Sequence, residues 1–175
     1  MGIPRRPKKV KLIAGLLFND TKKYSAAKDG LVKMFGRVDF ESELLDFTHT
    51  AYYTDEMGAG LKRKFLSFER LLDPKNICTV KIKTNRLEKR LSKNGKRTVN
   101  IDPGYLDLSK LVLFSTKDYS HRIYLDKGIF AECTLFYKDN DFNSWPWTYP
   151  DYKSGEYLNI FRSIRQICNG QKKTI

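Results

Sequence analysis

Residues 10–18 constrain the fold of this chain most strongly, because they form a nearly continuous apolar run. Such a run suits a β-strand that is buried on both faces. An Asn-Asp-Thr sequence at 19–21 then offers an N-cap for a helix that we expect to end at Gly36. Apolar and polar residues alternate over 38–41, which is typical of a strand with one exposed face. The first third of the chain is therefore predicted to be β-α-β.

Four further elements have clear local signals. Helical spacing over 75–93 and after Ser154 predicts two amphipathic helices, and 121–137 has the pattern of a β-hairpin. The Asp-Pro-Gly sequence at 102–104 predicts a turn after a short strand. We expect an α+β protein whose mostly antiparallel sheet has its helices packed on one face. A ferredoxin-like arrangement is one candidate, and a barrel-like closure of the strands is the main alternative.

The chain is long enough for one domain with a sizeable core, having 175 residues of which 41% are hydrophobic. We expect a basic N-terminal arm at 1–9, a single domain at 10–168 and a C-terminal tail at 169–175. The three cysteines are dispersed and form neither a disulfide framework nor a metal knuckle. The N-terminus lacks the apolar segment of a signal peptide, and no run is long enough to cross a membrane. A cytoplasmic protein without a membrane partner is therefore expected.

A formal net charge of +13 indicates an anionic partner, which could be nucleic acid, anionic lipid headgroups or a phosphorylated small molecule. The charge is also compatible with a purely solvated surface. The chain has no phosphate loop, no glycine-rich dinucleotide fingerprint and no nucleophile elbow. Its two histidines, His49 and His121, lie at unrelated positions, so a metal site built on histidine is not predicted, and the sequence leaves the cofactor unknown. A Mg²⁺ site made of carboxylates stays open.

The predicted helix at 75–93 and the residues after it are crowded with cations. Such a helix could contact a phosphate backbone or simply be solvated. The candidate nucleic-acid contacts are Lys83, Arg86, Lys89, Arg90, Lys93 and Arg97.

A second cluster, at 117–122, could support catalysis on a phosphorylated substrate. His121 would act as acid or base, Lys117 and Arg122 would hold phosphate, and Asp102 or Glu132 would supply the carboxylate. The alternative for His121 is a hydrogen-bonded residue at a strand end. A third cluster is the aromatic and proline-rich segment 145–152, whose Trp147, Tyr149 and Tyr152 could stack on bases or cap the core.

Several long motifs carry a family resemblance: FLSFERLLDP, VNIDPGYL, KDYSHRIYL and PWTYPDY. Over about residues 3–165 the chain resembles a widespread bacterial family of unknown function, some members of which carry an automatic GTP-binding label. The resemblance implies a single-domain protein and a set of recurring polar or aromatic residues: Lys83, Asn85, Asn100, Asp102, Tyr105, Lys117, Asp118, His121, Arg122, Glu132, Trp147, Tyr149, Asp151 and Tyr152.

These observations give three hypotheses for the function. The leading one is binding of RNA or single-stranded nucleic acid through the basic helix and the aromatic segment. The alternative is a small enzyme that acts on a nucleotide or another phosphorylated substrate, and a scaffold or interaction module is the third. The enzyme hypothesis requires the 117–122 cluster and a carboxylate to meet in one concave pocket. The sequence leaves the substrate, the pathway and the oligomeric state open.

Overall fold

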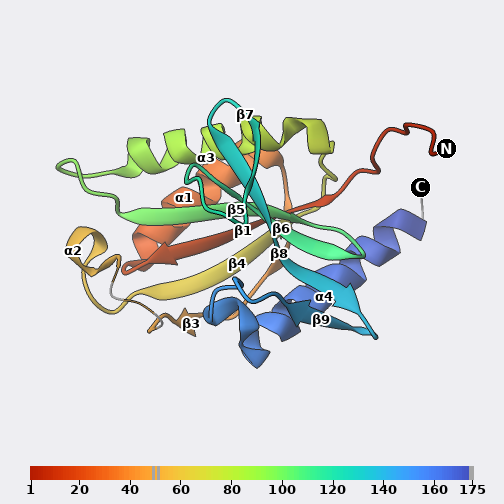
Figure 1. The fold of residues 1–175 in the computed structure, drawn as a ribbon. Coiled ribbons are helices and arrows are strands. Elements are labelled where there is room, and N and C mark those ends of the chain that lie inside the picture. Colours follow the sequence, from red (N-terminus) through yellow and green to blue (C-terminus); the bar gives the residue numbers. More distant parts are fainter. Residues whose placement is uncertain (49, 51, 174–175) are drawn as a thin grey trace.

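The computed structural model describes residues 1–48, 50 and 52–173 (Figure 1). The strands are β1 Lys11–Phe18, β2 Val38–Glu41, β3 Leu45–Asp46, β4 Lys62–Phe68, β5 Val99–Leu106, β6 Lys110–Ser115, β7 Ile123–Asp126, β8 Ile129–Lys138 and β9 Asp141–Ser144. The helices are α1 Thr21–Phe35, α2 Thr54–Met57, α3 Ile77–Leu91 and α4 Gly155–Lys173, with 3-10 turns η1 Pro74–Asn76 and η2 Asp151–Lys153. His49 lies outside the described residues.

The first six major elements form a ferredoxin-like unit. The chain runs β1-α1-β2-β4-α3-β5, and the strands lie in the order β2-β4-β1-β5 with antiparallel pairing throughout. Side chains from α1 and α3 pack against the same face of this sheet. The predicted α+β class with a mostly antiparallel sheet is thus confirmed, and the β-α-β-β-α-β order is that of the ferredoxin-like fold.

The second half of the chain extends this sheet beyond β5. Strands β6, β8 and β7 follow in that order, while β3 pairs with β4 and β9 pairs with β8. The predicted hairpin is present as β7 and β8, and its turn has positive φ at Lys127 and Gly128. The path of the described strands runs from β2 to β7, so the sheet is open between them.

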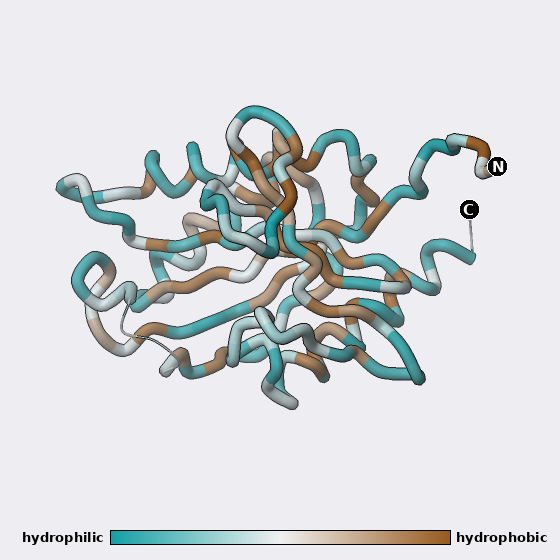
Figure 2. The backbone as a smooth tube through the Cα atoms, viewed as in Figure 1, coloured by the Kyte–Doolittle hydropathy of each residue, from teal (hydrophilic) through white to brown (hydrophobic). Residues whose placement is uncertain are grey.

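Helix α4 differs from the expectation that the helices share one face. Its Tyr157, Phe161 and Ile164 pack with Ile13 and Phe65, on the face opposite α1 and α3 (Figure 1). The reason lies in β1, whose even-numbered apolar residues face α1 and α3 and whose odd-numbered ones face away. Figure 2 shows the brown hydrophobic stretches gathered along the central strands. A strand that is apolar on both faces needs cover on both.

The predicted turn at 102–104 is wrong, because β5 runs straight through these residues. Pairing of β5 with β6 begins only at Gly104, and no pairing of Pro103 with β6 is present. The missing N–H of Pro103 therefore costs no hydrogen bond to that neighbouring strand, and a proline is tolerated there.

Two further sequence expectations bear on the rest of the chain. Cys78, Cys133 and Cys168 are all unpaired, as their dispersed positions predicted. Among the described residues, no helix has the length and apolar character needed to cross a membrane.

Candidate functional site

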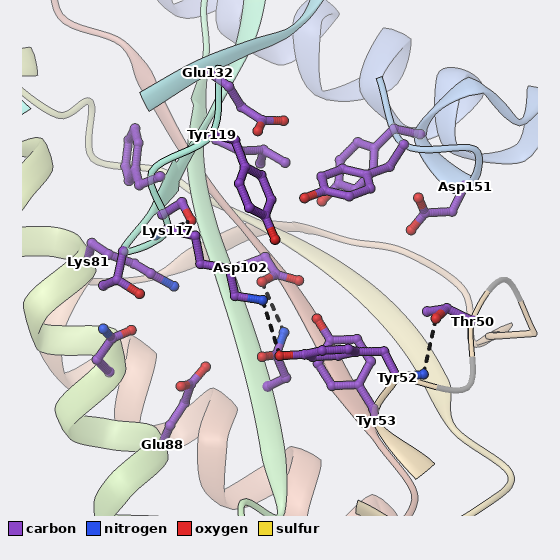
Figure 3. Close-up of a pocket in the computed structure, with 18 of the residues that line it drawn as sticks. Thr50, Tyr52, Tyr53, Lys81, Glu88, Asp102, Lys117, Tyr119, Glu132 and Asp151 are labelled. Carbon is purple, nitrogen blue, oxygen red and sulfur yellow. Dashed lines mark hydrogen bonds between the residues drawn. The ribbon is translucent and has the colours of Figure 1, made fainter. Parts of the chain in front are cut away.

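A pocket of about 620 Å³ opens where β5 and β6 separate (Figure 3). The two strands are paired only over Gly104–Leu106 and Leu111–Leu113, and the pocket lies beyond that point. We call it the β5–β6 pocket. Its wall is completed by α3, by the loop between β6 and β7, by the aromatic segment before α4, and by Phe47, Thr50, Tyr52 and Tyr53.

Pro103 and Gly104 stand at the point of separation. A Cβ on Gly104 would clash with the backbone oxygen of Val112, so glycine lets β5 and β6 approach closely there. Three residues before Gly104, on the side of β5 that β6 leaves unpaired, the backbone of Ile101 bonds to side chains of α3. Glu88 accepts from its N–H, and the ammonium of Lys81 lies 3.4 Å from its oxygen. Helix α3 thereby caps the part of β5 that β6 leaves unpaired.

Glu88 is the acidic group of this α3 wall. Burial raises the pKa of its carboxyl to about 7, although Lys81 and the N–H of Ile101 partly oppose that shift. Both the protonated and the ionised form are therefore populated near neutral pH. Lys81 and Glu88 are both buried side chains, and Asn85 lines the pocket from the same helix.

The floor of the pocket is built around Arg63, which is 3% exposed. Its guanidinium lies 3.0 Å from Asp102 and 3.6 Å from Asp151, and it contacts the rings of Phe47 and Phe65 at 5.1 and 5.6 Å from their centroids. Gly15 on β1 makes room for this group, because a Cβ there would lie 2.9 Å from Nη1 of Arg63. The floor thus combines one buried cation with two carboxylates.

Two polar groups of the floor have no hydrogen-bond partner among the described residues. They are Nε of Arg63 and the hydroxyl of Tyr152. Both side chains are almost fully buried and both line the pocket. Burial also raises the pKa of Tyr152 well above its usual value, so its hydroxyl stays protonated.

Glu132 organises the wall opposite α3. Its Oε2 accepts from Nε of Arg122 at 2.7 Å and lies 3.2 Å from Nε2 of His121. Arg122 also donates to Ser115, to the backbone oxygen of Lys117 and to the hydroxyl of Tyr149, at 2.7, 3.0 and 2.8 Å. One guanidinium therefore ties together β6, β8, the loop between β6 and β7, and the aromatic segment.

Lys117 lies at the mouth of the pocket. Its ammonium donates to the hydroxyl of Tyr52 at 3.1 Å and sits 4.6 Å from the centre of that ring. Arg97 is held differently, because Glu56 binds its guanidinium through both carboxylate oxygens. Within the described part of the chain, neither Lys81 nor Lys117 has a carboxylate within ion-pair distance. These two ammonium groups are available to an anion.

The residues proposed from the sequence for catalysis mostly meet in this pocket. Lys117, Arg122, Asp102 and Glu132 line it. His121 does not, since it sits behind Glu132 with its ring stacked on Trp147 at 5.8 Å between centroids. The aromatic segment has two environments: Tyr149 and the buried Tyr152 line the pocket, whereas Trp147 is partly exposed and stacks on Trp145.

The residues proposed for nucleic-acid contact divide in the same way. Arg97 lines the pocket, whereas five others are exposed on the outer side of α3 or just after it. These five form what we call the basic face of α3: Lys83, Arg86, Lys89, Arg90 and Lys93. Lys81, which belongs to the same basic stretch of sequence, is buried and turned toward β5.

Sequence reasoning missed several residues of the pocket. The predicted site residues include none of Arg63, Tyr52, Tyr53, Tyr119 and Glu88. One signal was available for α3, because Lys81, Asn85 and Glu88 follow one another at i, i+4 and i+7 beside the apolar stripe. Among the described residues, no group of three or more His, Cys, Asp or Glu is arranged to hold a metal ion.

The chain matches the family model of a domain of unknown function (DUF4416) over residues 8–167. The chain belongs to the DUF4416 family. No curated protein and no solved structure matches it. The β5–β6 pocket lies within the matched residues, so it belongs to the DUF4416 domain itself.

Proposed function

We propose that this DUF4416 protein binds a small phosphorylated molecule in the β5–β6 pocket. The observation that carries the proposal is the pair of lysines, Lys81 and Lys117, which line the pocket with no carboxylate of the described residues within ion-pair distance of their ammonium groups. An ammonium group in a partly enclosed site is stabilised by an anion, and a phosphate group supplies both charge and acceptor oxygens.

The size and the walls of the pocket support a small organic ligand rather than a bare ion. A volume of about 620 Å³ is in the range of pockets that enclose small ligands. Rings from several elements line it, among them Phe47, Tyr53, Phe114 and Tyr119. Aromatic walls of this kind suit a ligand that carries a planar ring, such as a nucleotide.

The same pocket contains a group suited to proton transfer. Because the pKa of Glu88 is about 7, its carboxyl can give or take a proton at neutral pH, and Asp102 lines the pocket as a second carboxyl group. This supports an enzyme that acts on the phosphorylated ligand, with Glu88 in the acid-base role that the sequence suggested for His121.

The test compares binding of pyrophosphate and of nucleoside monophosphates to the wild type and to three variants, by calorimetry or NMR titration. Lys81→Met and Lys117→Met each remove one ammonium group from the pocket. Lys138→Met removes one from the exposed end of β8 and is the matched control. We expect the first two to weaken binding by about tenfold, the usual effect of losing a hydrogen bond to a charged group, and the control to bind like the wild type. Equal affinity in all four proteins would contradict the proposal.

A second candidate function is supported by the basic face of α3. Its five cations are exposed, and none of them has an ion pair within the described part of the chain. Such a face fits the phosphate backbone of RNA or of a single strand. A merely solvated helix is the competing explanation.

This second candidate is tested with a charge-reversal triple variant, Arg86→Glu, Arg90→Glu and Lys93→Glu. Its control is Lys22→Glu, Lys33→Glu and Arg37→Glu, which makes the same change of charge at exposed positions in or near α1. Loss of RNA binding in the first variant only, together with a shallower dependence of affinity on salt, would support the α3 face. Equal losses in both would indicate that net charge alone attracts the RNA.

A further inference from the structure

The β5–β6 pocket has two ends that differ in charge. At the floor, Arg63 contributes one positive charge, while Asp102 and Asp151 contribute two negative charges. The lysines at the mouth and along α3, Lys117 and Lys81, make no ion pair with this group, and no carboxylate of the described residues lies within ion-pair distance of their ammonium groups. In Figure 3, Asp102 lies between Lys81 and Glu88 on one side and Asp151 on the other. A phosphate group is therefore favoured near the lysines and disfavoured at the floor.

The floor also contains a hydroxyl group that has no partner. Tyr152 is 3% exposed, lines the pocket, and its hydroxyl makes no hydrogen bond to any described residue. Buried hydroxyl groups are nearly always hydrogen-bonded, because an unpaired one costs free energy. The geometry therefore points to a bound group that forms a hydrogen bond with this hydroxyl.

Asp102 has unused acceptor capacity next to it. One of its oxygens accepts from Arg63 and the other from Asn100, each at 3.0 Å. A carboxylate offers about four acceptor sites, so each oxygen can accept one more hydrogen bond. The side chain is 29% exposed, which leaves it accessible from the pocket. The floor is therefore complementary to a ligand that presents hydrogen-bond donors along one edge.

We propose that the floor takes the N–H-bearing edge of a nucleobase, with donors to Asp102 and to the Tyr152 hydroxyl, while the phosphate of the same ligand contacts Lys81 and Lys117. This inference rests on the proposed function and narrows the phosphorylated ligand to a nucleotide bound in one orientation. The aromatic walls favour a planar base over an aliphatic amine, because a flat ring packs against them over its whole face.

Tyr152→Phe is the first test variant, because it deletes only the unpartnered hydroxyl and leaves the packing of the ring in place. Asp102→Asn is the second and removes the acceptor charge. Tyr24→Phe, at a buried position on the other face of the sheet, is the matched control. The probes are nucleoside monophosphates with each of the four bases, the corresponding nucleosides, inorganic phosphate and an aminoalkyl phosphate. Affinities are measured by NMR titration, and thermal unfolding of each variant is recorded in parallel.

We expect Tyr152→Phe to lower the affinity for nucleotides and nucleosides by about 3- to 10-fold, and Asp102→Asn to lower it by about 10- to 100-fold. Neither variant should change the affinity for inorganic phosphate. Lys117→Met should weaken nucleotides and phosphate but leave nucleosides unchanged. Tyr152→Phe should unfold at the same temperature as the wild type or above it, since it removes an unpaired buried group.

Four outcomes overturn the inference. If both floor variants bind nucleotides as the wild type does, or lose phosphate affinity to the same degree, the floor does not hold the base. If the aminoalkyl phosphate depends on Asp102 and the nucleotides do not, the floor holds an amine. If the wild type binds nucleotides no more tightly than inorganic phosphate, the proposed orientation of the nucleotide is wrong while the proposed function stands. A wild type that binds no phosphorylated probe removes the proposed function and this inference with it.

Discussion

The carboxylate of Glu88 in α3 accepts the backbone N–H of Ile101 in β5, at a point where β5 has no strand on that side. A helix side chain thus satisfies a strand backbone group that would otherwise face the pocket unpaired. Lys81, two turns earlier in the same helix, reaches the oxygen of the same residue. The pocket can therefore penetrate the sheet without leaving the backbone of Ile101 unsatisfied.

The first prediction concerns the pH dependence of stability at Glu88. Its pKa is raised from 4.5 in the unfolded chain to about 7 in the fold, so the unfolded state releases this proton first as the pH rises. The contribution of Glu88 to stability is therefore complete below pH 4.5 and is lost progressively up to about pH 7. Glu88→Gln keeps the acceptor for Ile101 but cannot ionise.

We expect the free energy of unfolding of Glu88→Gln, relative to that of the wild type, to rise by an amount on the order of 3 kcal/mol between pH 4.5 and 7. Urea unfolding at several pH values measures this difference. Glu43→Gln, at an exposed position, controls for the loss of one negative charge. A difference between Glu88→Gln and wild type that does not vary with pH would show that Glu88 does not titrate in this range.

The second prediction concerns the close approach of β5 and β6 at Gly104. Gly104→Ala would force a methyl group onto the backbone oxygen of Val112, which cannot move without breaking the strand pairing. We expect it to lower the free energy of unfolding by about 1–3 kcal/mol. Gly155→Ala is the control, since nothing lies within 4 Å of the added methyl group at the start of α4. Similar stabilities of the two variants would mean that the approach of the strands is not tight.

The third prediction compares two arginines of different burial. The Arg122 side chain is 5% exposed and makes four hydrogen bonds, whereas Arg162 binds Asp141 at the surface. Lysine cannot reproduce a planar fork of donors. Arg122→Lys should therefore cost about 2–3 kcal/mol, and Arg162→Lys at most about 1 kcal/mol, in chemical denaturation. Equal costs would show that the bonds of Arg122 do not hold the pocket wall together.

Local sequence patterns predicted a helix, strand or turn correctly where the residues that determine it all lie within one segment. The apolar run of β1, the amphipathic stripe of α3 and the Lys127-Gly128 turn each specify their own structure. The Asp-Pro-Gly signal at 102–104 failed because its meaning depends on a distant strand. The same three residues that form a turn in isolation can extend a strand whose neighbour pairs only from Gly104 onward.

The pocket was predictable only in part, because its residues come from distant segments. Lys117 and Arg122 lie close in sequence and were noticed as a cluster. Arg63 pairs with Asp102 across 39 positions, and no periodicity links them. The site depends on the strand order, which places β4 and β5 on either side of β1. No local sequence pattern predicts that order.

The ferredoxin-like unit ends with β5, and the pocket lies along the junction between this unit and the strands added after it. Its walls come from both parts, with Lys81 and Asp102 on one side and Lys117 and Glu132 on the other. A ligand held between them would act as a clamp across the junction. Ligand binding should then slow amide hydrogen exchange in β6 more than in β1. The strands that follow the ferredoxin-like unit would therefore open less often when the ligand is bound.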